Sequence, residues 1–211
     1  MDLDGPVLYE PQRHDVSGFD CGSEAQTRWL HQVARIAQAT GTARVYVVSP
    51  AGQNRVVGYH ALAAASVSHE DASPALLKSA GRSPIPIILL ARLGVDVTAQ
   101  GQGLGAALVK DAMLRATQAA EIVGARAFVI HAESDRARAF YLHLAEFEAS
   151  PTDPLHLMLL MSEIARSALD EADPDPRNVT GLLDRIDGAW EDALRGTAEA
   201  DAGEGTPLEE L

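Results

Sequence analysis

A glycine-rich turn between an apolar strand and a long helix constrains the fold more than any other feature of this sequence. The strand is expected over Ile85–Val97 and the helix over Leu104–Ile122, and three glycines stand at alternate positions between and just inside them. Glycine lets the backbone approach a ligand closely, and the first N–H groups of a helix have no partner inside it. Together these groups bind anions, so the turn predicts a site for a phosphate or pyrophosphate.

Two common phosphate-binding patterns do not match this turn. A P-loop needs Lys followed by Ser or Thr at the turn, whereas Lys110 comes well inside the expected helix. A dinucleotide site needs G-x-G-x-x-G after an early strand, with an acidic residue about 20 positions later. Here the glycines read G-x-G-x-G, and no second strand–helix repeat follows. From these residues alone, a tight turn that binds no ligand remains the alternative.

Strands and helices alternate around the turn. We expect a helix over Ser23–Ala39, with Trp29, Leu30, Val33 and Ile36 buried on one face, and strands over Arg44–Ser49 and Arg55–Ser66. After the turn and its helix we expect a strand over Ala127–His131, a helix over Ser134–Leu144 and a strand over Leu155–Met161. This order predicts an α/β (α+β) fold with a mixed central sheet, partly parallel at its centre and flanked by helices.

The charge of the chain is unevenly distributed. Of the net charge of −13, residues 166–211 carry −9, with 4 Arg against 13 Asp and Glu. We therefore expect a catalytic or binding domain over residues 1–165 and an acidic extension over 166–211. The extension begins as a Pro- and Asp-rich linker, continues as a short amphipathic helix over Val179–Arg195 and ends as a disordered tail.

Several classes of protein are not expected. No apolar run approaches the roughly 20 residues that cross a bilayer, and the first residues lack the apolar segment of a secretory signal. Cys21 is the only cysteine, which excludes an internal disulfide and suits a reducing compartment. The histidines show no metal-ligand spacing and are interpreted as structural, namely His14, His60, His131 and His143. We expect a cytoplasmic protein without a metal or a membrane partner.

The turn and a later aromatic motif resemble the GNAT acyltransferase superfamily. The motif Gln100-x-x-Gly103-x-Gly105 follows the apolar strand, and Phe140-Tyr141 follows on a helix some 35 residues later. The resemblance implies a GNAT-like fold in which the turn holds the pyrophosphate of acetyl-CoA and the strand pairs with its pantetheine arm. The implied acetyl-CoA contacts are Leu93, Gly94, Val95, Gln100, Gly101, Gln102, Gly103, Leu104, Gly105, Ala106 and Ser134. For Ser134, a role as helix N-cap is the alternative.

A narrower resemblance covers residues 8 to about 161. Its motifs are His14–Gly22, Val56–Leu62, Pro84–Pro86 and Pro151–Leu155, which together resemble the GNAT toxins of bacterial toxin–antitoxin pairs. The resemblance implies acetylation of the amino acid on a charged tRNA and neutralisation by a ribbon-helix-helix antitoxin, and a homodimer is a further expectation. Candidate tRNA contacts are Arg35, Lys78, Arg82 and Arg92. The alternatives are a GNAT enzyme for a small-molecule amine or a protein N-terminus, and a catalytically idle antitoxin-binding module.

Acetyl transfer from a thioester to an amine sets the chemistry that the residues must supply. A free α-amino group has a pKa of about 7.7–8.0, so part of it is neutral near pH 7 and a strong base is not required. The leaving thiolate gains from a proton, and a tyrosine hydroxyl can donate one. By resemblance to the family, Tyr141 is the candidate acid. We expect Phe140 to face the core and Tyr141, about 100° further round the helix, to face the cleft.

Overall fold

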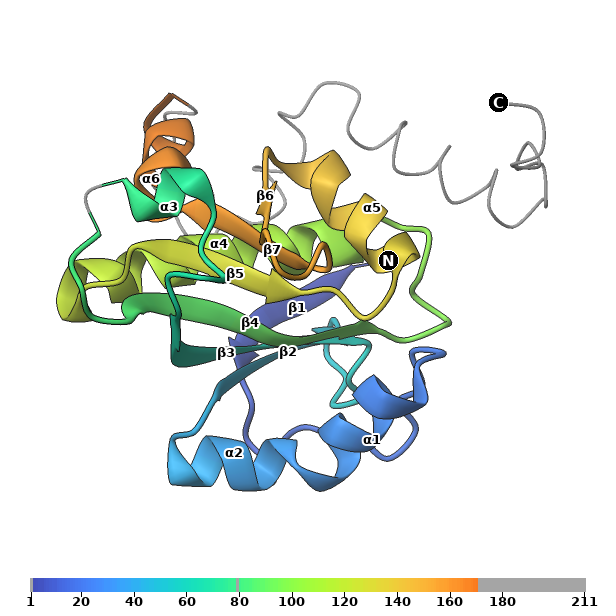
Figure 1. Ribbon diagram of the computed structural model, residues 1–211. Coiled ribbons are helices and arrows are strands. Elements are labelled where there is room, and N and C mark those ends of the chain that lie inside the picture. Colours follow the sequence, from blue (N-terminus) through green and yellow to red (C-terminus); the bar gives the residue numbers. More distant parts are fainter. Residues whose placement is uncertain (1, 79, 171–211) are drawn as a thin grey trace, which may run out of the picture.

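Figure 1 shows the computed structural model of the chain, of which residues 2–78 and 80–170 are described. In this part of the chain a seven-stranded sheet runs in the order β1-β2-β3-β4-β5-β7-β6. The strands are β1 (Leu3–Leu8), β2 (Arg44–Pro50), β3 (Gly58–Val67), β4 (Ile85–Val95), β5 (Ala127–His131), β6 (Glu148–Ala149) and β7 (His156–Leu160). The helices are α1 (Glu24–Gln32), α2 (Ala34–Thr40), α3 (Pro74–Leu77), α4 (Leu104–Val123), α5 (Asp135–Leu144) and α6 (Met161–Asp170).

The sheet is mixed, as the order of elements predicts. Among the strands of the described residues, only β4 and β5 pair in parallel, and they stand at the centre of the sheet with α4 as their connection. The remaining neighbouring strands are antiparallel. The expected α/β (α+β) fold with flanking helices is therefore confirmed. The expected helix over Val179–Arg195 and the tail lie outside the described residues, and α6 continues from the domain as far as Asp170.

Helices cover both faces of the sheet (Figure 1). On one face, which we call the α1 face, Tyr59 and Ala61 of β3 pack with α1 and α2, while Val129 of β5 and Met158 of β7 pack with α3. On the other, which we call the α4 face, buried residues of β4 and β5 pack with α4, α5 and α6. None of the helices in the described ranges is long and apolar enough to cross a membrane.

The first expected helix is wrong in its continuity and in its buried face. The chain forms two helices that meet at Val33, whose backbone (φ −109°, ψ −37°) is more extended in φ than that of an ideal helix. The face turned to the sheet is the one with Leu30 and the alanines, so Val33 and Ile36 are 41% and 56% exposed. Leu30 is buried as expected, together with Ala34 and Ala37. Small alanines at these positions allow α2 to lie close to the sheet.

Strand boundaries also differ from expectation by more than one residue at two places. β3 begins at Gly58 rather than Arg55, and β4 ends at Val95 rather than Val97. The second difference has a local cause, because the side chain of Asp96 accepts hydrogen bonds from the turn that follows. β1, α3, β6 and α6 were not expected from the sequence at all.

β4 and β5 separate halfway along β4, at the end of β5, and this separation positions the site. Their parallel ladder ends at the pair Leu90–Ile130, whereas β4 stays paired with β3 as far as Val95. At the same point the β3–β4 register shifts, so that Ala91 is an extra residue on β4. Within the described part of the chain, β4 beyond Leu90 has a strand on one edge only. We call this opening between Ala91–Val95 and the end of β5 the fork.

Candidate active site

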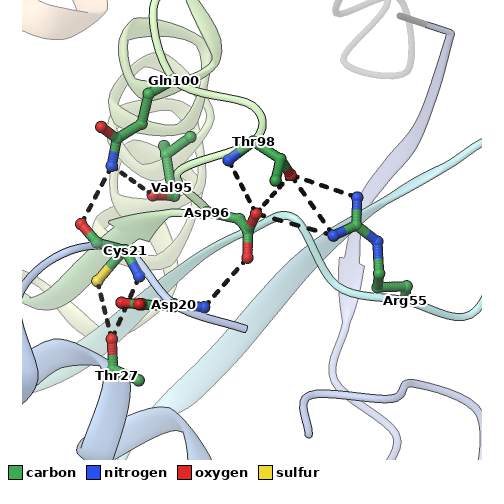
Figure 2. A network of polar contacts seen from close by, with 8 residues as sticks. All are labelled: Asp20, Cys21, Thr27, Arg55, Val95, Asp96, Thr98 and Gln100. Atoms are coloured by element: carbon green, nitrogen blue, oxygen red, sulfur yellow. Dashed lines mark hydrogen bonds and ion pairs between the residues drawn. The ribbon is translucent and has the colours of Figure 1, made fainter. Parts of the chain in front are cut away.

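A buried carboxylate holds the turn that follows β4. Asp96 is 2% exposed, and its carboxylate accepts hydrogen bonds from the backbone N–H of Asp20 (3.1 Å) and from the N–H and Oγ1 of Thr98 (3.0 and 2.5 Å). Arg55 adds an ion pair at 3.8 Å (Figure 2). Burial raises the pKa of the Asp96 carboxyl, but the hydrogen bonds from Thr98 and Asp20 outweigh it and hold that pKa below its ordinary value. Asp96 therefore stays ionised and fixes the turn.

The side chain of Gln100 joins three segments of the site. Its Nε2 donates to the carbonyl oxygens of Cys21 (3.1 Å) and Val95 (2.9 Å), as Figure 2 shows. The loop before α1, the end of β4 and the turn are thereby tied together. Because the amide nitrogen is used inside the protein, Gln100 supports the turn through its side chain, and its contact with acetyl-CoA stays a prediction.

The glycines give the turn its shape. Gly101 and Gly103 have φ values of 70° and 77°, which side chains disfavour, and Gly103 is the N-cap of α4. Gly103 has no side chain to cap the first N–H groups, and the helix ladder begins only with the bond from Ala107 N to Gly103 O (3.1 Å). The N–H groups of Leu104, Gly105 and Ala106 therefore have no acceptor within the helix. This arrangement fits the phosphate site that the sequence predicts.

Gly94 has a structural reason to be glycine. A Cβ atom at Gly94 would lie 2.7 Å from Cε1 of Tyr59 and 3.3 Å from the sulfur of Cys21. Tyr59 is fully buried, and its hydroxyl donates to the carbonyl oxygen of Gln26 in α1 (2.8 Å). The strand expected to pair with pantetheine is thus packed closely against β3 and against the loop before α1. Leu93, Gly94 and Val95 all lie on the fork side of Leu90.

Tyr141, and not Phe140, is the more buried of the two neighbouring aromatic residues. Tyr141 is 8% exposed and packs in the α4-face cluster, whereas Phe140 is 36% exposed, with its ring 3.4 Å from the position of a Cβ on Gly105. The expectation that Phe140 faces the core is wrong, because its ring lies against the first turn of α4 at Gly105 and stays partly exposed. The start of α5 is held by Ser134, whose Oγ accepts from Ala137 N (3.2 Å). Ser134 is therefore an N-cap, and its contact with acetyl-CoA stays a prediction.

The hydroxyl of Tyr141 stays protonated at neutral pH. Burial and, to a lesser extent, the nearby Glu133 carboxylate raise the pKa of Tyr141 to about 12. The phenol is therefore protonated throughout the neutral range.

On the α1 face, the fork is bordered by charged and aromatic side chains. Arg92 of β4 lies over the ring of Trp29 of α1, 5.8 Å from its centroid. Glu133, in the loop after β5, accepts hydrogen bonds from Ser23 (2.8 Å) and Gln26 (3.4 Å), and so links α1 to the opposite side of the fork. Sequence reasoning did not single out Glu133, because a lone carboxylate in a loop shows no partner until the chain is folded.

The four candidate tRNA contacts come from separate segments. All four are exposed, and Arg92 alone among them lies at the fork. Arg35 lies on α2 and Lys78 is the C-cap of α3, two helices that share the α1 face, while Arg82 lies in the loop before β4. Their contact with tRNA stays a prediction. Among the described residues, no group of three or more His, Cys, Asp or Glu side chains could hold a metal ion.

Comparisons with known proteins point to one family. No protein-family model matches the chain. It is 47% identical to the tRNA-acetylating toxin of Mycobacterium tuberculosis over 149 residues, which are 71% of this chain and 87% of the relative.

Solved structures with a similar fold point to the same family. AtaT complexed with acetyl-methionyl-tRNAfMet has a TM-score of 0.71 at 27% identity, and the match covers 79% of this chain and 99% of that chain. An AtaT mutant bound to acetyl-CoA and to the C-terminus of the antitoxin AtaR has a TM-score of 0.65 at 25% identity, over 79% and 98% of the two chains. Sequence and fold together show that this chain belongs to the tRNA-acetylating toxins of the GNAT acetyltransferase superfamily.

Proposed function

We propose that this protein transfers the acetyl group of acetyl-CoA to the α-amino group of an aminoacyl-tRNA and so acts as a translation-blocking toxin. The observation that carries the proposal is the fork, because it combines an anion site at the start of α4, an unpaired edge of β4 and a protonated Tyr141 hydroxyl. The tRNA-acetylating relative and the acetyl-CoA and tRNA complexes of AtaT support the same reaction.

Different segments at the fork would bind different parts of acetyl-CoA. The N–H groups of Leu104, Gly105 and Ala106 would hold the pyrophosphate. The edge of Leu93–Val95 that no strand of the described residues pairs with would bind the pantetheine arm, apart from the Val95 carbonyl oxygen that Gln100 already uses. An arm that starts at the turn and follows β4 inward reaches the closed end of the fork, where the ladder resumes at Leu90. Acetyl-CoA, when bound, supplies the activated acetyl thioester at that end.

Tyr141 is the proposed general acid. Its hydroxyl approaches from the α4 face, and its raised pKa keeps the proton in place until a thiolate, whose pKa is about 8.5 in the free thiol, develops beside it. Asp96 and Gln100 act through the turn, because their hydrogen bonds hold the loop at Asp20–Cys21 against the end of β4. They are positioning residues in this proposal.

The test is direct chemical detection of the product. Purified protein is incubated with acetyl-CoA and a mixture of charged tRNAs, and the aminoacyl adenosine released by nuclease is analysed by mass spectrometry. We expect a mass increase of one acetyl group on at least one aminoacyl species. Acetylation of free amino acids or peptides with every charged tRNA unmodified would contradict the proposal and favour an enzyme for another amine.

Partners follow from the family relationship. We propose that a ribbon-helix-helix antitoxin neutralises the toxin, that the toxin forms a homodimer and that it acts in the cytoplasm, where charged tRNA is found. The AtaT complex with the C-terminus of AtaR supports an antitoxin partner. Co-expression with a candidate antitoxin, followed by co-purification and light scattering, tests both the complex and the mass of the free toxin.

A further inference from the structure

The two faces of the sheet bring different side chains to the closed end of the fork. His131 is the last residue of β5 and directly follows Ile130, the last β5 residue that pairs with β4. Alternate residues of a strand share a face, so His131 lies on the α1 face with Val129. Tyr141 packs on the α4 face, in the same buried cluster as Ile130. An imidazole and a phenol therefore border the same opening from opposite faces.

His131 is held in place by a second imidazole. It pairs with His156 across the β5–β7 ladder, and the two rings stack with their centroids 3.8 Å apart. Nε2 of His156 lies 3.4 Å from Oδ2 of Asp153, in the turn before β7. His131 itself is exposed, so its ring is supported by His156 on one side and accessible on the other.

The charges around His131 favour its neutral form. The groups that face it are His156 from β7, Asp153 from the preceding turn and Arg92 from β4, while the carboxylate of Glu133 is engaged by α1. Burial lowers the pKa of the His131 imidazole, His156 and Arg92 lower it further, and Asp153 partly opposes them. An imidazole with a pKa below its ordinary value is unprotonated at neutral pH and can accept a proton.

We propose that His131 is the general base of the reaction and accepts the proton that the substrate α-amine loses when it attacks. The proposal rests on the proposed aminoacyl-tRNA acetylation and adds a residue to it. It changes the interpretation drawn from the sequence, where His131 is a structural residue at a strand end. The geometry that carries it is the placement of His131 and Tyr141 on opposite faces of one opening.

The proton balance of the step is complete with these two side chains. A carbon–nitrogen bond forms between the amine and the acetyl carbonyl carbon, and the bond from that carbon to the CoA sulfur breaks. A nitrogen of His131 takes one proton from the amine nitrogen, which becomes acidic as the new bond forms. Tyr141 gives its proton to the sulfur, and exchange with solvent restores both side chains. The products are the N-acetylated aminoacyl-tRNA and CoA with a free thiol.

The test compares His131→Asn with His143→Asn, which removes an exposed imidazole from α5. We expect His131→Asn to lower kcat by about 100-fold with little change in KM for tRNA. This is the low end of the range for general acid–base catalysis, because the amine is already partly neutral near pH 7. The His143→Asn control should match wild type. Wild-type kcat in His131→Asn would overturn the proposal.

The pH profile separates a base from a group that only binds. In wild type two groups must be unprotonated, the amine and His131, so log(kcat/KM) should fall by about two units per pH unit at the acidic end. In His131→Asn only the amine remains, and the slope should fall to about one. His131→Phe serves as a second variant: if the imidazole only stacks against a base of the tRNA, Phe restores activity, and that result would also overturn the proposal.

Further measurements test whether His131 is neutral at neutral pH and whether its role is only structural. NMR titration of the His131 ring signals should give a pKa below the ordinary value of about 6.5, and a pKa at or above that value would contradict the proposal. Acetyl-CoA affinity and the melting temperature of His131→Asn should equal those of wild type, since a drop in either would assign His131 a structural role. Failure of wild type to acetylate any charged tRNA would instead contradict the proposed function.

Discussion

Gly103 shows how much of the site depends on one residue without a side chain. Its φ of 77° and its place as the N-cap of α4 put it beside the N–H groups that would hold the pyrophosphate. Gly103→Glu adds a negative charge there, and we expect at least a tenfold loss of acetyl-CoA affinity, which is about 1.4 kcal/mol. Isothermal titration calorimetry measures it.

Gly103→Gln is the matched control, because it imposes the same backbone strain and nearly the same volume without the charge. Its affinity should lie between those of Gly103→Glu and wild type. Unchanged binding in Gly103→Glu, with a native circular dichroism spectrum, would remove the turn from the acetyl-CoA site.

Tyr141 carries the second prediction at this scale. Tyr141→Phe keeps the ring that packs in the α4-face cluster and removes only the hydroxyl. We expect unchanged acetyl-CoA binding and a kcat lower by roughly 10²–10⁴-fold, the usual range for a lost general acid. Steady-state kinetics with charged tRNA measure the loss. Tyr46→Phe, which removes a hydroxyl on β2 beside Arg115, should leave kcat unchanged. Equal turnover in Tyr141→Phe and wild type would mean that water protonates the thiolate.

At the scale of elements, a buried polar network joins the sheet to α4. His60 of β3 is fully buried, and its Nε2 lies 2.7 Å from Oδ2 of Asp111 in α4. Nε of Arg115 donates to the same oxygen at 2.7 Å, and its Nη2 donates to the carbonyl oxygen of Pro6 in β1 (2.9 Å). In the register of the sheet, His60 pairs with Leu93 of the fork. The network therefore holds the cofactor strand and the cofactor helix in a fixed relation.

This network predicts how stability responds to acid. Burial lowers the pKa of His60 although Asp111 opposes it, and the buried Nδ1 of His60 has no acceptor among the described residues. Near pH 6.5, His60 therefore binds a proton in the unfolded chain but not in the folded protein. The free energy of unfolding should fall as the pH is lowered from about 6.5 towards the folded pKa. Thermal unfolding measured between pH 7.5 and pH 5 tests this.

His60→Gln removes the titrating group and keeps an amide that can donate to Asp111. The pKa of His131 is lowered as well, so the informative quantity is the difference between wild type and variant at each pH. We expect this difference in melting temperature to shrink as the pH falls, because only wild type loses the His60 contribution. A constant difference would show that His60 binds protons equally in the folded and unfolded states, which would contradict the prediction.

Sequence patterns predicted the long elements and failed on the short ones. The β4–turn–α4 unit was found because its apolar run, glycines and helical period agree over some 35 residues. The break at Val33 was missed because no Gly or Pro marks it and the apolar residues keep a helical spacing on both sides of it. β1 and β6 were missed because their stability comes from pairing with β2 and β7 rather than from local preference.

At the scale of the whole molecule, the candidate site is assembled from segments far apart in the chain. Gln100 meets Cys21 and Asp96 meets Asp20 across more than 70 residues, and Glu133 meets Ser23 across 110. Motifs in the sequence located the turn and Tyr141, because each motif is local. They could not show that β4 and β5 separate after Leu90, and that separation is what brings His131 and Tyr141 to one opening. No local sequence motif indicates contacts between segments that are this far apart in the chain.

The net charge of the whole chain is unevenly distributed along the sequence. Residues 171–211 carry 3 Arg against 12 Asp and Glu, a net charge of −9, so most of the excess of −13 lies outside the domain that holds the fork. Arg35, Lys78, Arg82 and Arg92 are exposed on that domain. A segment with this charge can compete with the phosphates of RNA for the same cations. The alternative is an extension that only increases solubility.

Salt distinguishes these two roles of residues 171–211. Exposed charges act over about 8 Å at physiological ionic strength and over longer distances at low salt. We expect deletion of residues 171–211 to increase the rate of charged-tRNA acetylation at low salt, with the advantage shrinking as salt is raised. RNA binding itself weakens with salt, so the quantity to measure is the ratio of kcat/KM for truncated and full-length protein at each concentration. A full-length variant with the 12 acidic residues changed to Asn and Gln should behave like the truncated protein, because charge alone is removed. A ratio near one at every salt concentration would assign the segment no part in RNA recognition.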